Sequence, residues 1–192
     1  MHTVEMIVDE IMTLYRTCGE EDYIGEPVSQ LEHMSQMALL AETAGHDEEV
    51  VLAAFLHDIG HLVAFMGTYA SMQGFGAMDH EDLGAHYLES KGFSDRLIRL
   101  VQSHVDAKRY LAHREPAYRE RLSPASVRTL QFQGGVMTEE EAIVFEQDPH
   151  ASLKIKFRRW DDEAKVRGGA MIGLDQMEAM LTRYLTNQLQ VK

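Results

Sequence analysis

Apolar residues recur every three to four positions along most of the chain, which is the spacing of one face of an α-helix. This period predicts helices over residues 4–15, 31–41, 48–65, 80–91, 93–105 and 174–189. A capping box formed by Thr138 and Glu141 predicts a short helix that closes before Pro149, and a further helix surrounds Trp160. No strand-like alternation of useful length occurs, so the sequence predicts an all-α fold with residues 1–192 in a single domain.

The segment 48–65 is the most apolar of these helices. Asp47 can cap its start, and apolar residues surround its axis on nearly all sides, so we expect this helix at the centre of the fold. Residues 66–78 contain several glycines and no period, which predicts a loop directly after the central helix.

Composition and charge limit the kind of partner. The chain has 192 residues, 45% of them hydrophobic, and a formal net charge of -13. This charge repels nucleic acid and anionic membranes, so we expect neither as a partner. No apolar run approaches the roughly 18 residues of a membrane span, and residues 1–10 lack the pattern of a signal peptide, so we expect a cytoplasmic protein. The single cysteine, Cys18, excludes an intramolecular disulfide and a cysteine-rich zinc site.

Three titratable residues, His57, Asp58 and His61, lie within five positions of the otherwise apolar central helix. Residues four apart share a helix face, so His57 and His61 are expected to point into the same space. Buried side chains of this kind each need a partner, and one alternative is that they are hydrogen-bonded residues of the core. A metal ion would satisfy several of them together.

Other candidate ligands occur singly on different predicted helices: His33, His80, His104 and Asp161. With His57 and Asp58 they form a set of nitrogen and oxygen donors without a thiolate. Such a set favours iron or manganese over a structural zinc site. Six protein ligands exceed the need of one catalytic ion, so we expect two metals bridged by a carboxylate.

The order of these ligands resembles the HD-domain superfamily in its dinuclear form, which is named after an adjacent His-Asp pair like the one at 57 and 58. The same set resembles the mixed-valent diiron oxygenases, the relatives of myo-inositol oxygenase. Further motifs are similar to the oxygenases that cleave the carbon–phosphorus bond of 1-hydroxy-2-aminoethylphosphonates or 1-hydroxy-2-(trimethylamino)ethylphosphonates. These motifs are Asp22-Tyr23-Ile24-Gly25-Glu26, Gln30-Leu31-Glu32-His33, Gln131-Phe132-Gln133-Gly134-Gly135 and Arg158-Arg159-Trp160-Asp161-Asp162.

The resemblance implies an HD-domain helical bundle with two iron ions, Fe(II) and Fe(III), and dioxygen as co-substrate. One iron would be held by His33, His57, Asp58 and Asp161, and the other by Asp58, His80 and His104. Asp58 would bridge the two. Tyr23 matches a family tyrosine that occupies an iron position until substrate displaces it.

A phosphonate needs several directed donors. Lys108 lies four residues after His104, Arg158 lies three before Asp161, and Ser126 and Thr129 share one side of a short predicted helix. The resemblance implies that the phosphonate contacts are Lys108, Ser126, Thr129, Arg158 and His61. It also implies that Glu26 receives the amino group of the substrate.

The aromatic and methionine side chains near the loop 66–78 allow two interpretations. They are Phe65, Met66, Tyr69, Met72, Phe75 and Met78. They could line a pocket for a quaternary ammonium group, or they could simply pack as a lid. The methylation of the substrate amine is therefore left open.

The function implied by the resemblance is oxidative cleavage of a small organophosphonate, which releases phosphate and glycine or glycine betaine. One alternative is an HD-type phosphohydrolase that uses the same ligands to activate water, although hydrolysis has no need of a displaceable phenol. A second alternative is a non-catalytic, metal-stabilised interaction module. The oligomeric state is left open.

Overall fold

The computed structural model describes residues 3–23, 25–67, 69–72, 74 and 76–190. Ile24 and Phe75, which the sequence analysis named, lie outside the described residues. The helices are α1 (Val4–Cys18), α2 (Gln30–Thr43), α3 (Glu48–Leu56), α4 (Ile59–Phe65), α5 (His80–Ser90), α6 (Asp95–Arg114), α7 (Pro116–Arg121), α8 (Pro124–Phe132), α9 (Glu139–Glu146), α10 (Ala151–Glu163) and α11 (Leu174–Gln190). Apart from two isolated β-bridges, the described part of the chain contains no strand, which confirms the all-α prediction.

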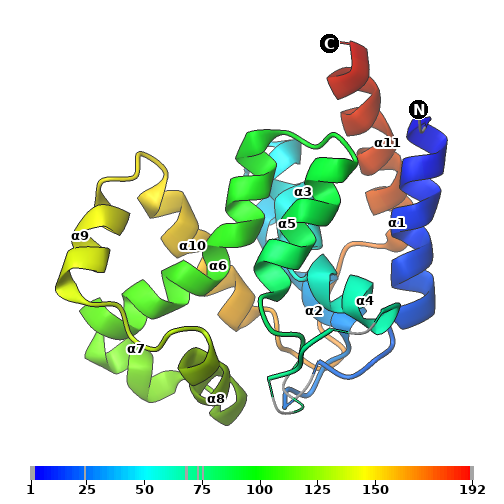
Figure 1. Ribbon diagram of the computed structural model, residues 1–192. Helices are drawn as coiled ribbons and strands as arrows, with labels where there is room; N and C mark the ends of the chain where they lie inside the picture. Colours follow the sequence, from blue (N-terminus) through cyan, green and yellow to red (C-terminus); the bar gives the residue numbers. More distant parts are fainter. Residues whose placement is uncertain (1–2, 24, 68, 73, 75, 191–192) are drawn as a thin grey trace.

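The helix α3 lies at the centre, where it packs against α2, α6 and α11 (Figure 1). Its residues 50–56 are at most 2% exposed, as expected for a helix that is apolar almost all round. The long helix α6 runs from this core into a second group of helices, α7 to α10, and α1 and α11 pack together at the other side (Figure 1). Candidate ligands on α2, α5, α6 and α10 and in the turn after α3 are thereby brought towards the middle of the bundle.

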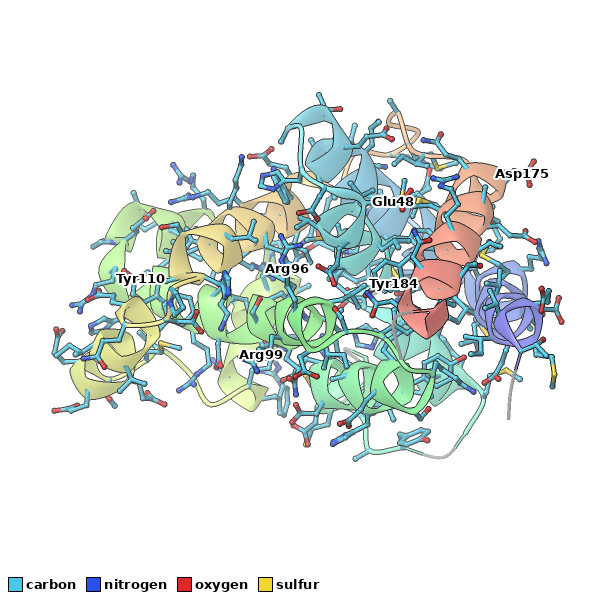
Figure 2. The ribbon with its side chains drawn as sticks, turned by 90° about the horizontal axis from the view of Figure 1, so that it is seen from above. Glu48, Arg96, Arg99, Tyr110, Asp175 and Tyr184 are labelled. Atoms are coloured by element: carbon cyan, nitrogen blue, oxygen red, sulfur yellow. The ribbon has the colours of Figure 1, made fainter. Side chains whose placement is uncertain are left out.

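The start of α3 is fixed by polar contacts. The Asp47 side chain accepts a hydrogen bond from the backbone N–H of Val50, which confirms the predicted cap. Arg96 of α6 donates to Asp47 at 2.9 Å and to Glu49 at 2.6 Å, and the Tyr184 hydroxyl of α11 donates to Glu49 at 3.1 Å. Figure 2 shows Arg96 and Tyr184 over this end of the helix. These contacts join three helices at the end of α3 opposite to His57.

The structure corrects the prediction of one continuous helix over 48–65. α3 ends at Leu56 and α4 begins at Ile59, with His57 and Asp58 in the turn between them. The Nδ1–H of His57 donates to the Ala54 carbonyl at 2.9 Å, and Asp58 leaves helical geometry with φ -105 and ψ 15. The apolar pattern continues on both sides of this break, so periodicity alone could not reveal it.

The break allows α4 to approach α5 very closely. A Cβ atom at Gly60 would lie 1.9 Å from the His80 carbonyl oxygen, so a glycine is required at this crossing. The close approach brings the first turn of α5, and with it His80, next to Asp58.

Two further differences from the prediction concern the end of α6 and the presence of α7. The helix expected over 93–105 continues to Arg114, which keeps Lys108 on the same helix as His104. The short helix α7 was not predicted, because six residues are too few to display a period. Among the residues that the structure describes, no helix has both the length and the apolar character needed to cross a bilayer.

Candidate metal centre and substrate cavity

Six buried side chains from five elements meet around Asp58. His33 comes from α2, and His57 lies with Asp58 in the turn after α3. The remaining three come from α5, α6 and α10: His80, His104 and Asp161. All six are 0–4% exposed. These are the residues that the sequence analysis singled out as candidate ligands.

The two oxygens of Asp58 face different histidines. Oδ2 lies 3.2 Å from His57 Nε2 and 3.6 Å from His33 Nε2. Oδ1 lies 3.2 Å from His80 Nε2 and 3.4 Å from His104 Nε2. Since each oxygen belongs to a separate group of donors, the carboxylate has the geometry of a bridge.

The Asp161 carboxylate completes the first group. Its Oδ1 lies 3.4 Å from His33 Nε2. Its Oδ2 accepts a hydrogen bond from Arg158, three residues earlier on α10. Arg158 thus occupies one oxygen of Asp161 and leaves the other directed at the histidines.

Backbone carbonyls fix the tautomers of three histidines. The Nδ1–H of His33 donates to Ala164 O at 2.9 Å, and the Nδ1–H of His57 and of His104 donate to carbonyls three residues earlier, at 2.9 and 2.7 Å. Each Nε2 therefore presents a lone pair to the centre. In this tautomer the lone pairs of His33 Nε2 and His57 Nε2 face each other across 3.1 Å.

Three buried carboxylate oxygens at the centre have no hydrogen-bond partner: both oxygens of Asp58 and Oδ1 of Asp161. Buried acceptors without donors are costly, and lone pairs that face one another add to that cost. Neighbouring ligands of a metal with bonds of about 2.1 Å lie roughly 3.0 Å apart at right angles. The donor spacing of 2.9–3.6 Å and the unpartnered oxygens therefore fit a metal centre.

The charge balance of the centre favours an ionised bridge. Burial by itself would raise the pKa of Asp58, but His57 and His80 hold that pKa well below its usual range. Burial would likewise raise the pKa of Asp161, but the Arg158 guanidinium and His33 hold it well below its usual range. Both carboxylates therefore carry the negative charge that a bound cation needs.

A cavity of about 380 Å³ opens beside this centre. Its lining includes His80 and His104 as well as Tyr23. All the side chains expected to contact substrate also line it: Glu26, His61, Lys108, Ser126, Thr129 and Arg158. The fold thus brings together the candidate ligands and the candidate substrate contacts at one site.

Lys108 supplies a buried amine at one side of the cavity. Lys108 is only 3% exposed, and its Nζ donates a hydrogen bond to Thr129 Oγ1 at 3.0 Å. Burial, with the charge of Arg158 adding to its effect, lowers the pKa of Lys108 to about 7. Within the described part of the chain no carboxylate forms an ion pair with this amine, so an anion is the ligand that it favours.

Arg158 is directed more towards protein acceptors than towards the cavity. Besides Asp161, it donates to Asp162 and, through Nε at 3.0 Å, to the Tyr118 hydroxyl. The Tyr118 hydroxyl in turn donates to Asp162 at 2.7 Å. Arg158 therefore fixes Asp161 and adds positive charge to the wall of the cavity.

His57 and His61 do not share one continuous helix, because the helix breaks between them, yet both point towards Asp58 as expected. His61 stacks on His80, with 4.1 Å between ring centroids. Its Nδ1 accepts from the Ala77 backbone N–H at 3.2 Å, and burial lowers its pKa to about 3. His61 is therefore neutral, with its remaining proton on Nε2 at the cavity.

Tyr23 covers the His33 side of the centre. The two rings stack with 4.0 Å between centroids and an interplanar angle of 16°. Burial, together with the charges of Asp58 and Asp161, raises the pKa of the Tyr23 phenol well above its usual value. The phenol is therefore protonated in this arrangement.

The residues between α4 and α5 form part of the cavity wall. Phe65, Tyr69 and Met72 all line the cavity, whereas Met66 does not. Phe65 and Tyr69 are 46% and 50% exposed, and Met72 is buried, so the first two lie at the rim. This placement is compatible with a lid and with an aromatic contact to a ligand, and both interpretations remain.

The geometry of this centre is accompanied by a sequence match to a known protein family. A model described as the HD domain matches residues 31–148, a span that exceeds half of the chain and contains the adjacent His57 and Asp58. The chain belongs to the HD-domain family. Asp161 lies beyond the matched span and joins the centre through α10.

Three relatives of this HD-domain protein cover most of its length. An uncharacterized protein of Acanthamoeba polyphaga mimivirus is 40% identical over 97% of this chain and 85% of its own. A 1-hydroxy-2-(trimethylamino)ethylphosphonate dioxygenase of Leisingera caerulea, which forms glycine betaine, is 42% identical over 83% of this chain and 80% of its own. A hydroxymethylphosphonate dioxygenase of Gimesia maris is 37% identical over 86% of this chain and 88% of its own.

Four polar residues of the HD-domain cavity were not assigned a role from the sequence: Gln30, Ser71, Gln133 and Lys165. The two glutamines lie in motifs that carried the family resemblance. Lys165 follows Asp161 by four residues, a spacing that could have indicated it. However, α10 ends at Glu163, so helical spacing alone would not have placed Lys165 in the cavity.

Proposed function

We propose that this HD-domain protein is a diiron oxygenase that cleaves the carbon–phosphorus bond of a 1-hydroxyphosphonate. Asp58 would bridge the two ions, because its oxygens face separate donor groups. One iron would have His33, His57 and Asp161 as its further ligands. The other would have His80 and His104. When bound, the iron pair supplies the redox chemistry that activates dioxygen.

The chain's own residues would orient the substrate. Lys108 and Thr129 lie within hydrogen-bonding distance of each other, so both side chains are suited to bind the same phosphonate group. The Nε2–H of neutral His61 adds a donor without adding charge, and the Ser126 hydroxyl completes the group. The Tyr23 phenol, which packs over His33, would leave when the substrate hydroxyl takes its place.

The proposed reaction balances without an external reductant. A 1-hydroxyphosphonate and one molecule of dioxygen give a carboxylic acid and inorganic phosphate. The carbon–phosphorus and carbon–hydrogen bonds at C1 break, one oxygen atom enters the carboxylate, and the other enters phosphate. The four electrons that reduce dioxygen come from C1 and from the carbon–phosphorus bond. With an amino or a trimethylamino group on C2, the acid is glycine or glycine betaine.

The observation that carries this proposal is that the two oxygens of Asp58 face separate groups of Nε2 donors, beside a cavity lined by Lys108, Thr129 and Tyr23. The activities after which the Leisingera caerulea and Gimesia maris relatives are named support the reaction class. The alternative is phosphate-ester hydrolysis with the same metal ligands. The stacked Tyr23 favours the oxygenase, because a hydrolytic water needs no displaceable phenol.

The test is phosphate release by iron-reconstituted, partly oxidised protein with 1-hydroxy-2-aminoethylphosphonate and with hydroxymethylphosphonate. We expect release only with oxygen, and ¹⁸O₂ should place one labelled atom in each product. A coupled Fe(II)Fe(III) resonance signal should change when the hydroxyphosphonate binds. Equal release without oxygen, or release from a nucleotide supported by manganese, would instead establish a phosphohydrolase.

A matched pair of variants tests the assignment of the bridge. Asp58→Asn should lower the rate of phosphate release at least about a thousandfold, since an amide cannot offer two anionic oxygens to two cations. Asp9→Asn makes the same chemical change at an exposed position on α1 and should keep the activity of the parent. Equal activity of the two variants would refute the bridging role.

A further inference from the structure

An ion pair is built into the wall of the cavity. Lys165 Nζ donates to Glu26 Oε1 at 3.1 Å, and the Ser123 hydroxyl donates to the same oxygen at 2.6 Å. The side chains of Lys165 and Glu26 are only 13% and 9% exposed. Lys165 Nζ also lies 5.6 Å from the centroid of the Tyr23 ring. The pair therefore lies beside the phenol that substrate is proposed to displace.

The pair changes what Glu26 can offer to a ligand. A free carboxylate in the cavity would attract a substrate ammonium group. In this protein the carboxylate already has a partly buried cationic partner, and the charges of such a pair are costly to separate. A substrate ammonium must either replace Lys165 at Glu26 or lie next to a second positive charge. Both outcomes weaken its binding.

The charge of Lys165 is also felt elsewhere in the cavity. It contributes, after burial and Arg158, to the low pKa of Lys108. Lys165 is therefore close enough to add to the positive potential that meets a phosphonate. A ligand that has the phosphonate but no cation would gain this attraction without the repulsion.

The two relatives named as phosphonate dioxygenases differ in whether their substrate carries a cation. The substrate named for the Leisingera caerulea protein carries a trimethylammonium group, whereas that of the Gimesia maris protein, hydroxymethylphosphonate, carries no amine. We propose that Lys165 is a specificity-determining residue that, by holding Glu26, lowers the preference of the cavity for hydroxyphosphonates with an ammonium group relative to those without one. The proposal rests on the proposed function for the class of ligand only.

A purely structural role for Lys165 gives a different expectation. Lys165 follows Ala164, whose carbonyl accepts from His33, so it could simply hold the end of α10. In that case its removal would weaken both kinds of ligand alike. The ratio of two affinities separates these roles, and neither affinity alone does so.

The test is Lys165→Met in the iron-reconstituted protein, measured by titration calorimetry without oxygen. The two probes are 1-hydroxy-2-aminoethylphosphonate and hydroxymethylphosphonate. We expect the affinity for the amino compound, relative to that for hydroxymethylphosphonate, to rise by about tenfold to a hundredfold, the effect of one charge-assisted contact. Glu26→Gln should shift the ratio in the opposite direction.

Two further variants control the measurement. Arg167→Met removes one positive charge from an exposed position two residues away and should leave the ratio unchanged. Lys165→Arg retains the charge and should also keep the parental ratio. If Lys165→Met does not fold, Lys165→Gln replaces it. An unchanged ratio, a shift towards hydroxymethylphosphonate, or an equal loss of both affinities would overturn the proposal.

Binding and turnover also separate this proposal from the proposed function. If the parent protein binds both phosphonates but releases no phosphate with oxygen, the oxygenase function fails while the ratio still decides the role of Lys165. If the parent binds neither compound, both proposals are overturned.

Discussion

The buried amine of Lys108 should cost the protein stability in a way that depends on pH. Its pKa falls from the usual 10.5 to about 7 because it is buried and lies near Arg158. At about 1.4 kcal/mol per pH unit, this difference corresponds to a penalty on the order of 5 kcal/mol when the amine is protonated in the folded protein. Lys108→Met removes the charge and keeps the shape of the side chain.

The direction of the pH effect follows from proton binding. Below pH 7 the amine is protonated in both states, so the folded state carries the full penalty. Between about pH 7 and 10.5 the folded protein has lost this proton and the unfolded chain retains it, so the penalty shrinks as pH rises. The two pKa values give a penalty of about 5 kcal/mol at pH 6 and about 2 kcal/mol at pH 9.

The assay is urea unfolding of chelator-treated parent and variant at pH 6 and pH 9. Groups that titrate in both proteins cancel in the difference between their free energies of unfolding. We expect this difference to favour Lys108→Met more strongly at pH 6, by about 2.5–3 kcal/mol relative to pH 9. Lys91→Met, which removes a lysine paired with Glu10, is the control and should give the same difference at both pH values.

A difference for Lys108→Met that does not change between pH 6 and pH 9 would refute the reasoning. The same variant should lose phosphonate affinity by about tenfold or more, because a charge-assisted contact is removed. The stabilised protein should therefore be the weaker binder. That combination would show that the buried amine lowers the stability of the protein but increases its affinity for an anionic ligand.

Three further perturbations test the centre and its support. Asp161→Asn should lower the bound metal by about one ion per chain in elemental analysis, whereas Asp58→Asn should lose both, and equal stoichiometries would contradict the bridge. Glu81 Oε2 lies 3.3 Å from His80 Nδ1, so Glu81→Ala should weaken metal retention about tenfold to a hundredfold in chelator competition, and unchanged retention would remove Glu81 from the centre. Gly60→Ala places a Cβ atom 1.9 Å from the His80 carbonyl and should destabilise the protein by about 3 kcal/mol or more in urea unfolding, with an unaffected midpoint as the contrary result.

The centre combines several groups that would be unfavourable without a cation. Unpartnered oxygens of Asp58 face the Nε2 atoms of four histidines, and the backbone carbonyls hold three of the rings in one tautomer. The apolar residues of α3 and the crossing at Gly60 hold these groups in place. Helix packing therefore provides the stability that keeps the candidate ligands preorganised.

Local patterns in the sequence determined most helices and the identity of the candidate ligands. The caps at Asp47 and Thr138 depend only on neighbouring residues, and the structure contains both. The central position of α3 could be predicted because a helix that is buried on all sides is apolar on nearly all sides. The adjacent His57 and Asp58 were recognisable for the same reason, since titratable residues are rare in such a segment.

Tertiary structure alone decided how these ligands face one another. The turn at Asp58 interrupts an apolar pattern that would suit a continuous helix, and it lets Gly60 approach the His80 carbonyl, twenty residues away in the sequence. The pairing of Lys165 with Glu26 joins segments separated by 139 residues. Period and spacing are local properties, whereas these contacts depend on how helices pack, so only the folded chain defines the charges and donors that a ligand meets.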